Sequence, residues 1–143
     1  MIFLKKWLSL LLIGIVMLCM MTSVTAAVPN SGVAIPLWDN ISSVTPTIDF
    51  NGTNGYACAV IAAKAGTSEI NASLAVYKQV GNDWVYVDHD SGRTTSSLNY
   101  GLNVSFQGEP GAYYKAVLNV TVTKNGISEN AIKFAYATCP QGT

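Results

Sequence analysis

Apolar and polar residues alternate along almost the whole chain from Trp38 onward, and this pattern constrains the fold more than any other. The stretch 98–106, LNYGLNVSF, is apolar at every second position, with Asn, Gly and Ser between. Successive side chains of a β-strand point to opposite faces, so a period of two indicates a strand with one buried face. Further stretches of this kind follow one another about every ten residues. The sequence therefore predicts an all-β fold, an antiparallel sandwich of about seven strands.

Two turn signals predict hairpins between neighbouring strands. Asn125-Gly126 is the stronger one, because this pair favours a two-residue turn. The second, Gly-Asn-Asp at 81–83, leads into WVYVDH at 84–89. After Asn125-Gly126 the chain continues as AIKFAYATC (131–139), in which three large side chains share one face: Ile132, Phe134 and Tyr136.

The stretch WVYVDH carries the candidate partner-binding residues. Trp84 and Tyr86 share one face of the predicted strand, and Val85 and Val87 share the other. If the valines face the core, two rings stand in a row on the surface, where they suit stacking on a sugar or gripping a protein partner. If the rings face inward, they are ordinary core residues. The sequence leaves both orientations open.

Residues 1–26 have the order of a secretory signal peptide. Lys5 and Lys6 precede an uncharged apolar run over 7–21, and small residues follow up to Ala26. A helix that spans a membrane needs about 20 apolar residues, more than this run provides. We therefore expect a signal helix cleaved after Ala26, a flexible tether over 27–37 and one domain over 38–140, secreted to the cell exterior. An uncleaved N-terminal segment that holds the protein at the cell surface is the alternative.

Loss of the leader also sets the charge of the mature chain. The full sequence has eight Lys and Arg and eight Asp and Glu, so removal of Lys5 and Lys6 leaves six basic and eight acidic side chains. This slight negative balance gives no electrostatic footprint for nucleic acid or for an anionic membrane. Neither is expected as a partner after cleavage.

The cysteines predict a disulfide. Three are present in the full sequence, and Cys19 leaves with the leader. In an exported protein the remaining two, Cys58 and Cys139, are expected to pair. Such a bond could stabilise the fold by about 4 kcal/mol through its effect on the unfolded chain. Two buried free thiols are the alternative.

Five asparagines match the acceptor pattern for N-linked sugar: Asn40, Asn51, Asn71, Asn103 and Asn119. The Asn and the hydroxyl residue of this pattern are two positions apart, which is also the period of outward side chains on a strand. A solvated face rich in Asn, Ser and Thr therefore produces the pattern without any sugar at Asn71, Asn103 and Asn119. We favour this explanation, and it predicts that these three side chains are exposed.

Several short motifs give the chain a likeness to a known group. They are WDNI at 38–41, an early Cys58, the Asn125-Gly126 hairpin and a terminal Cys139. With these motifs the chain resembles an uncharacterised family of small secreted proteins of Gram-positive bacteria over roughly residues 38–140. The resemblance implies an immunoglobulin-like β-sandwich that is bacterial, exported and non-enzymatic.

The stretch EPGAYYK at 109–115 is similar to the tyrosine corner of immunoglobulin-like domains, in which a Tyr hydroxyl bonds to the backbone a few residues upstream. Tyr113 is the expected corner residue. The alternation of the following residues favours Tyr114 instead, unless a bulge intervenes. Lys115 stands where such domains have their second cysteine, so their usual disulfide between the sheets is not expected.

His89, the only histidine, is flanked by Asp88 and Asp90. Nothing resembles a nucleophile elbow, so no catalytic residue is expected. The two aspartates have the spacing of paired calcium ligands, but Arg93 and Asn99 stand where a calcium-binding loop of the EF-hand type needs Gly and Glu. We expect neither a metal nor a cofactor.

The sequence as a whole predicts a secreted, non-enzymatic β-sandwich module that binds an unknown protein or glycan partner. A structural or self-assembling surface protein is the alternative, and a secreted hydrolase built around His89 is the less expected one.

Overall fold

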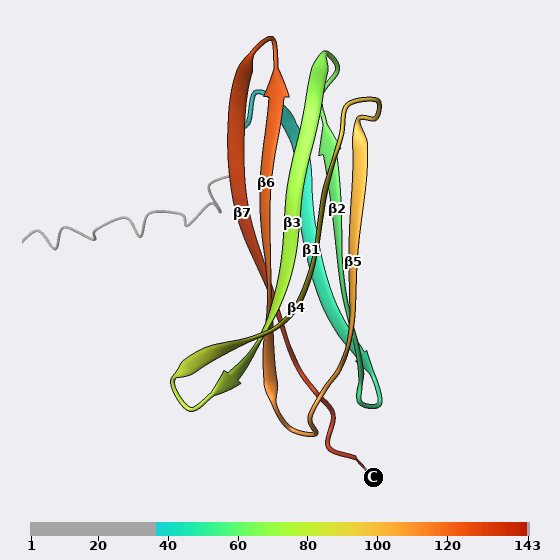
Figure 1. Ribbon diagram of the computed structural model, residues 1–143, viewed down its shortest axis with the longest axis vertical. Helices are drawn as coiled ribbons and strands as arrows, with labels where there is room; N and C mark the ends of the chain where they lie inside the picture. Colours follow the sequence, from blue (N-terminus) through green and yellow to red (C-terminus); the bar gives the residue numbers. More distant parts are fainter. Residues whose placement is uncertain (1–36, 143) are drawn as a thin grey trace, which may run out of the picture. The chain divides into compact units, whose positions relative to one another are not determined.

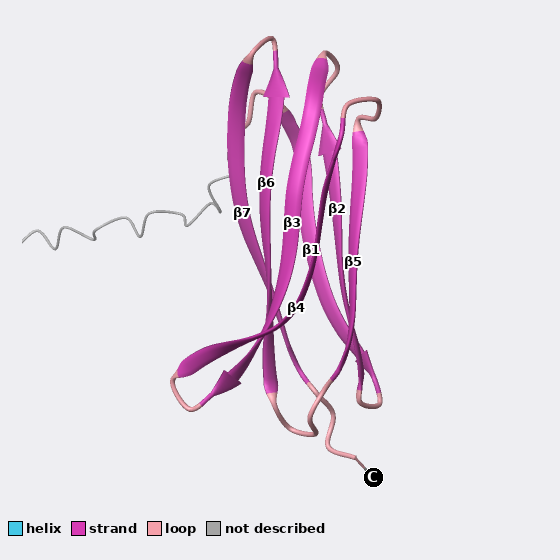
Figure 2. Ribbon diagram, in the orientation of Figure 1, coloured by secondary structure: helices cyan, strands magenta, loops and turns pink. Residues whose placement is uncertain are grey.

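The computed structural model describes residues 37–142. The predicted signal peptide with Cys19, and the predicted tether except for Leu37, lie outside the described residues. Within 37–142 the chain forms seven β-strands and no helix, which confirms the predicted all-β class (Figure 2). The strands are β1 (Ile41–Asn51), β2 (Asn54–Ala63), β3 (Thr67–Val80), β4 (Asp83–Thr94), β5 (Asn99–Gln107), β6 (Tyr113–Lys124) and β7 (Ile127–Thr138). No helix in this part of the chain is long and apolar enough to cross a membrane.

The strands form two antiparallel sheets that lie face to face (Figure 1). The smaller sheet has the order β1-β2-β5, and the larger has the order β4-β3-β6-β7. Tight hairpins join β1 to β2, β3 to β4 and β6 to β7, whereas the other connections cross between the sheets. The predicted antiparallel sandwich is therefore confirmed.

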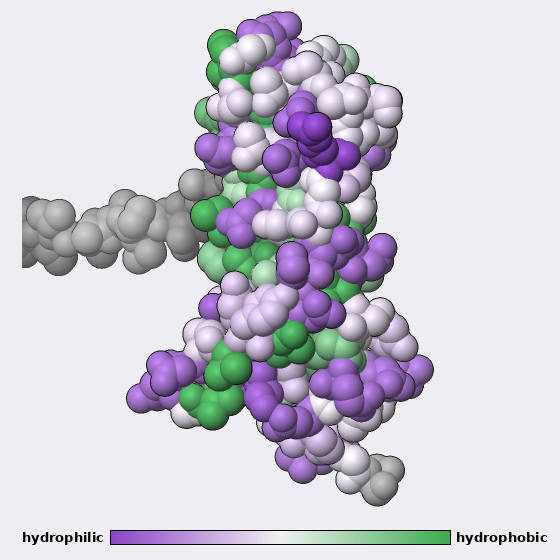
Figure 3. Space-filling view, in the orientation of Figure 1, coloured by the Kyte–Doolittle hydropathy of each residue, from purple (hydrophilic) through white to green (hydrophobic). Residues whose placement is uncertain are grey.

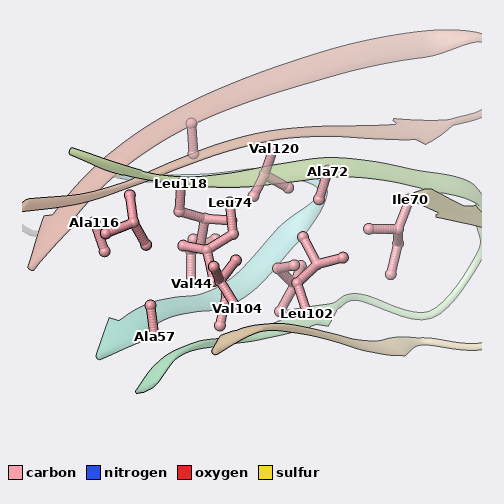
Figure 4. Close-up of a cluster of buried hydrophobic side chains, with 14 of the residues drawn as sticks. Val44, Ala57, Ile70, Ala72, Leu74, Leu102, Val104, Ala116, Leu118 and Val120 are labelled. Atoms are coloured by element: carbon pink, nitrogen blue, oxygen red, sulfur yellow. The ribbon is translucent and has the colours of Figure 1, made fainter. Parts of the chain in front are cut away.

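The core lies between the sheets and is made by alternate residues of each strand (Figure 4). Leu74 of β3 and Leu118 of β6 are register partners, and both are fully buried. On β5, Leu102 and Val104 are buried while Asn103 between them is exposed. Because burying one such side chain stabilises by ~1.5–3 kcal/mol, a slip of one residue would move a whole apolar set into solvent.

Tyr114 of β6 is the corner residue. Its ring is almost fully buried. The centre of this ring lies 5.3 Å from the ring centre of Phe50 and 5.1 Å from that of Phe106. Its hydroxyl accepts a hydrogen bond from the backbone N–H of Glu109 at 2.9 Å. The expectation of Tyr113 is wrong, because that residue is out of phase with the buried positions of β6 and lies on the opposite face.

Asn40 and Glu129 hold the segment before β1 against the β6–β7 hairpin. The buried Asn40 side chain donates hydrogen bonds to the carbonyl oxygens of Val122 and Ile127, at 3.1 and 3.0 Å. The Glu129 carboxylate accepts hydrogen bonds from three successive backbone N–H groups, at residues 39, 40 and 41, over 2.9, 2.8 and 3.0 Å. The segment before β1 is thus fixed by its own Asn40 side chain and by the Glu129 side chain of β7.

The hydrogen bonds to Glu129 also change its acidity. Partial burial acts to raise the pKa of the Glu129 carboxyl group, but the three backbone N–H groups and the nearby Lys64 ammonium group act in the opposite direction and prevail. The pKa of Glu129 therefore lies below its ordinary value.

The candidate glycosylation sites divide into two kinds. Asn71, Asn103 and Asn119 are exposed on strands, which confirms the predicted exposure, and Asn51 is exposed at the end of β1. Asn40 is 5% exposed, and its amide is used in the interior. A sugar at Asn40 is therefore incompatible with this fold.

The predicted disulfide between Cys58 and Cys139 is not formed, and both thiols are free. Cys58 lies on the outward face of β2, between two buried alanines. Cys139 is fully buried in the core. One thiol therefore lies on the outer face and the other in the core. Backbone hydrogen bonds hold the end of the chain instead, from Cys139 N–H to Ala112 and from Gly111 N–H to Cys139, both at 2.9 Å.

β4 is bound to both sheets. Next to β5, the Asp90 carboxylate accepts a hydrogen bond from the backbone N–H of Asn103 at 2.9 Å. Further toward the β3–β4 turn, a register shift at Val76 and Tyr77 bends the ladder, and the end of the hairpin projects away from the other strands (Figure 1). A β-bulge of this kind increases local twist and re-aims side chains.

Candidate functional site

The candidate site is the outer face of the four-stranded sheet, and β7 contributes its large side chains to it. Ile132, Phe134 and Tyr136 are 58%, 53% and 51% exposed. The inward face of the same strand carries the buried Ala131 and the half-buried Ala135, together with the half-buried side chains of Glu129 and Lys133. The apolar face of β7 is therefore turned to solvent and not to the core.

The register of the β6–β7 hairpin explains this orientation. Asn125 and Gly126 form a two-residue turn with positive φ values of 53° and 75°, as predicted. Opposed residues of two paired strands share a face. Leu118 is buried and pairs with Lys133, so the residues on either side of Lys133 must face outward. The large side chains of β7 are exposed because the turn fixes which residues oppose the core positions of β6.

The β3–β4 hairpin brings Trp84 and Tyr86 to the same outer face. Tyr86 pairs with Tyr77 and is 52% exposed, and Trp84 is half-buried by neighbours on that face. Val87 packs against the core, whereas Val85 is 48% exposed because the hairpin projects beyond the sandwich. Figure 3 shows hydrophobic residues beside hydrophilic ones on this projecting end. Of the two orientations that the sequence leaves open, the rings therefore face outward; partner binding by these residues stays a prediction.

Five aromatic side chains from four strands meet on this face, together with one lysine. We call this group the ring cluster: Tyr77, Trp84, Tyr86, Tyr113, Lys115 and Tyr136. Tyr113 and Tyr136 are stacked, with ring centres 5.8 Å apart and 12° between the ring planes. Trp84 lies 6.0 Å from the first and 6.3 Å from the second. Tyr77 meets Tyr86 edge to face at 6.0 Å. The rings support one another and so present a fixed surface.

Lys115 supplies the positive charge of the ring cluster. Its ammonium nitrogen lies 4.2 Å from the centre of the Trp84 ring and 5.5 Å from that of Tyr77. Both distances fall within the range of cation–π attraction. The lysine therefore orients rings of two neighbouring strands, a role that its sequence position alone did not indicate.

The residues that sequence reasoning missed could have been found from hairpin register. A two-residue turn at Asn125-Gly126 places Lys115 opposite Tyr136, and one at 81–82 places Tyr77 opposite Tyr86. These pairings follow by counting outward from each turn. The phase of the buried residues on β3 and β6 then assigns all four side chains to the outer face.

A shallow polar depression lies on the same face beside the ring cluster and has a volume of about 420 Å³. Its polar lining comes from all four strands: Asn71, Ser73, Ser91, Asn119, Thr121 and Asn130. Ile132 forms part of its apolar border. Phe134 follows Ile132 on the outward face of β7 and leads from the polar depression to Tyr136 of the ring cluster.

His89 lies beside Tyr86 and between two aspartates whose carboxylates accept backbone hydrogen bonds. Its Nδ1 atom lies 2.7 Å from the Tyr86 hydroxyl. The Asp88 carboxylate accepts a hydrogen bond from the His89 backbone N–H, and the Asp90 carboxylate is bound to β5. Within residues 37–142, no group of three or more His, Cys, Asp and Glu side chains could hold a metal ion. The carboxylates beside His89 are thus engaged by the backbone.

The fold is that of an immunoglobulin-like β-sandwich. Seven strands in two sheets and the corner at Tyr114 belong to this class. In the constant-type arrangement the fourth strand joins the sheet of the first, second and fifth strands. Here β4 pairs with β3 instead, which enlarges the sheet that carries the ring cluster.

No family model and no curated protein matches the sequence. Among solved structures, the chain is similar to the ASH/PapD-like domain 7 of human CEP192, with 12% identity, a TM-score of 0.48 and coverage of 80% of this chain and 97% of that one. It is also similar to part of β-glucuronidase 3 of Bacteroides uniformis, with 16% identity, a TM-score of 0.39 and coverage of 73% of this chain and 14% of that one. These likenesses concern the fold. The predicted relationship to secreted Gram-positive proteins gains no family match and stays an expectation.

Proposed function

We propose that the protein is an exported, non-catalytic module that binds a partner through the outer face of its four-stranded sheet. The observation that carries the proposal is the outward orientation of the large side chains of β7, which share the outer face with an equally exposed Tyr86. Proteins that act alone rarely expose a continuous apolar patch, and such patches mark interaction surfaces. The alternating inward face of β7 shows that this exposure is built into the register of the sheet.

The ring cluster is suited to binding because its parts are already ordered. Binding is weakened when flexible side chains must be immobilised, and aromatic rings have few torsions to fix. Tyr113, Tyr136 and Trp84 contact one another, and Lys115 covers part of the Trp84 ring. Export is supported by the order of residues in 1–26. A non-catalytic role is supported by the two carboxylates beside His89, which accept hydrogen bonds from backbone N–H groups.

The test compares two outer-face tyrosines on opposite sheets. Tyr136→Ala removes a ring of the ring cluster, and Tyr56→Ala removes a similarly exposed ring, 46% against 51%, from the other sheet. The chain and both variants are applied to an array of extracellular proteins and glycans. We expect Tyr136→Ala to weaken retention on the bound partner by about tenfold or more, and Tyr56→Ala by less than about twofold.

Trp84→Ala is a second variant with the same expected loss of binding, and the melting temperature of each variant shows that it is folded. Equal retention of Tyr136→Ala and wild type would contradict the proposal. So would self-association of the chain that Tyr136→Ala abolishes, measured by sedimentation at high concentration, because the face would then serve assembly and not a partner.

A further inference from the structure

We infer that the partner is a glycan, and that the polar depression receives uncharged sugar units whose chain continues over Phe134 toward the ring cluster. This inference rests on the proposed function and names its ligand. It is carried by the chemistry and shape of the polar depression, which are independent of the rings.

The hollow lies where short side chains of β4 and β3 meet longer ones of β6 and β7. Ser73 of β3 pairs with Ser91 of β4 on one side and with Asn119 of β6 on the other. Asn119 in turn pairs with Ile132 of β7, so one row of four residues crosses the whole sheet. The two serines are adjacent at the β4 end of this row, and their side chains are shorter than those of Asn119 and Ile132. A volume of about 420 Å³ is within the range of small-molecule sites.

The lining matches the hydrogen-bonding character of a sugar. Amide and hydroxyl side chains both donate and accept hydrogen bonds, as sugar hydroxyl groups do. Thr121 donates a hydrogen bond to the Asn130 Oδ1 atom at 2.7 Å, which orients that amide and leaves its N–H groups for a ligand. Within the described residues, no side-chain hydrogen bond occupies Ser73, Ser91 or Asn119.

The charges near the polar depression favour an uncharged ligand. None of the residues that line it carries a formal charge. The guanidinium group of Arg93, which pairs with Asn71 in the ladder, lies 3.8 Å from the Glu69 carboxylate. A phosphate or an acidic peptide needs cations that are free to pair with it, and the lining offers none.

The apolar part of the face indicates a chain of sugars and not a single one. Ile132, Phe134 and Tyr136 point outward in succession along β7. Residues 132 and 136 are four positions apart, which corresponds to ~13 Å along a strand. The C–H faces of successive sugar rings can lie on these side chains while their hydroxyl groups reach the amides. A protein partner would instead meet unpaired amides at the centre of its interface, where polar groups are costly unless bonded.

The experiment measures binding of the chain to an array of uncharged oligosaccharides, from disaccharides to octasaccharides of glucose, mannose and N-acetylglucosamine. The test variant is Asn119→Ala, and the matched control is Asn103→Ala, an exposed asparagine in the same kind of motif on the outer face of the other sheet. We expect binding to at least one oligosaccharide, weakened about tenfold or more by Asn119→Ala and less than about twofold by Asn103→Ala.

Three outcomes would overturn the inference. The first is that no uncharged oligosaccharide binds, while a protein on the array binds and Tyr136→Ala weakens that binding. The proposed function would then hold, and only the inference of a glycan partner would be wrong. The second is oligosaccharide binding that Tyr136→Ala weakens but Asn119→Ala and Asn130→Ala do not. The third is that neither proteins nor oligosaccharides are retained, which overturns the proposed function as well.

Discussion

The ammonium nitrogen of Lys115 lies 4.2 Å from the centre of the Trp84 ring, although β3 separates the strands that carry the two residues. The lysine side chain reaches across β3, passing within 5.5 Å of the Tyr77 ring centre. A single cation thus connects three strands on the outer face and helps to keep the projecting hairpin in place.

This contact predicts a measurable coupling between Lys115 and Trp84. Lys115→Met keeps most of the alkyl chain and removes the charge, and Trp84→Phe keeps a ring with a weaker attraction for cations. We expect a coupling free energy of about 0.5–1 kcal/mol from the two single variants and the double variant, measured by chemical unfolding. Additive effects would show that the cation and the ring act independently.

The hydrogen bond to the Tyr114 hydroxyl predicts that removing the hydroxyl groups of two adjacent tyrosines changes the free energy of unfolding unequally. Tyr114→Phe removes the hydroxyl that accepts the Glu109 N–H, in a partly buried place, so it should lower the free energy of unfolding by about 1–2 kcal/mol. Tyr113→Phe removes an exposed hydroxyl and should change it by less than about 0.5 kcal/mol. Chemical unfolding of both variants checks the prediction. A larger loss of stability in Tyr113→Phe than in Tyr114→Phe would contradict the assignment of Tyr114 as the corner residue.

Glu129 predicts a loss of stability in acid. Because its pKa is lowered on folding, the folded state favours the charged carboxylate. Its contribution is complete above the unfolded pKa of about 4.3 and is lost as the pH falls through the lower folded value. We expect the melting temperature to fall between about pH 5 and pH 3, and to fall less in Glu129→Gln than in wild type.

The control for this prediction is Glu69→Gln, which removes a carboxylate at the surface, 3.8 Å from Arg93. Exposed ion pairs contribute little, so its pH profile should follow that of wild type. If Glu129→Gln and Glu69→Gln have the same profile, the three backbone hydrogen bonds to Glu129 do not govern acid stability.

The two free thiols predict that reductant leaves stability unchanged. Alkylation of the folded protein should modify Cys58 and spare the buried Cys139, and alkylation after unfolding without reductant should modify both. Cys139→Ser should destabilise by about 1–3 kcal/mol because it places a hydroxyl in the core, whereas Cys58→Ser should be nearly neutral. Mass spectrometry of the peptides that contain Cys58 and Cys139 decides between free thiols and a disulfide.

The comparison of sequence and structure is clearest at β7. Alternation correctly predicts that Ile132, Phe134 and Tyr136 share a face, but their size alone would assign that face to the core. The pairing of Lys133 with the buried Leu118 reverses the assignment. The disulfide prediction failed in a similar way. It rested on the expected export of the chain, whereas the phase of β2 turns Cys58 outward.

The sequence by itself determined the strands, their two-sided character and the positions of the tight turns, because these depend on side chains near one another in the chain. Only the tertiary structure decided which strands lie side by side, that β4 joins β3, and that amides and rings from four strands share one outer face. Those relations depend on contacts between residues far apart in the chain. Their free energy is set by the packing of two whole sheets, which no local pattern records.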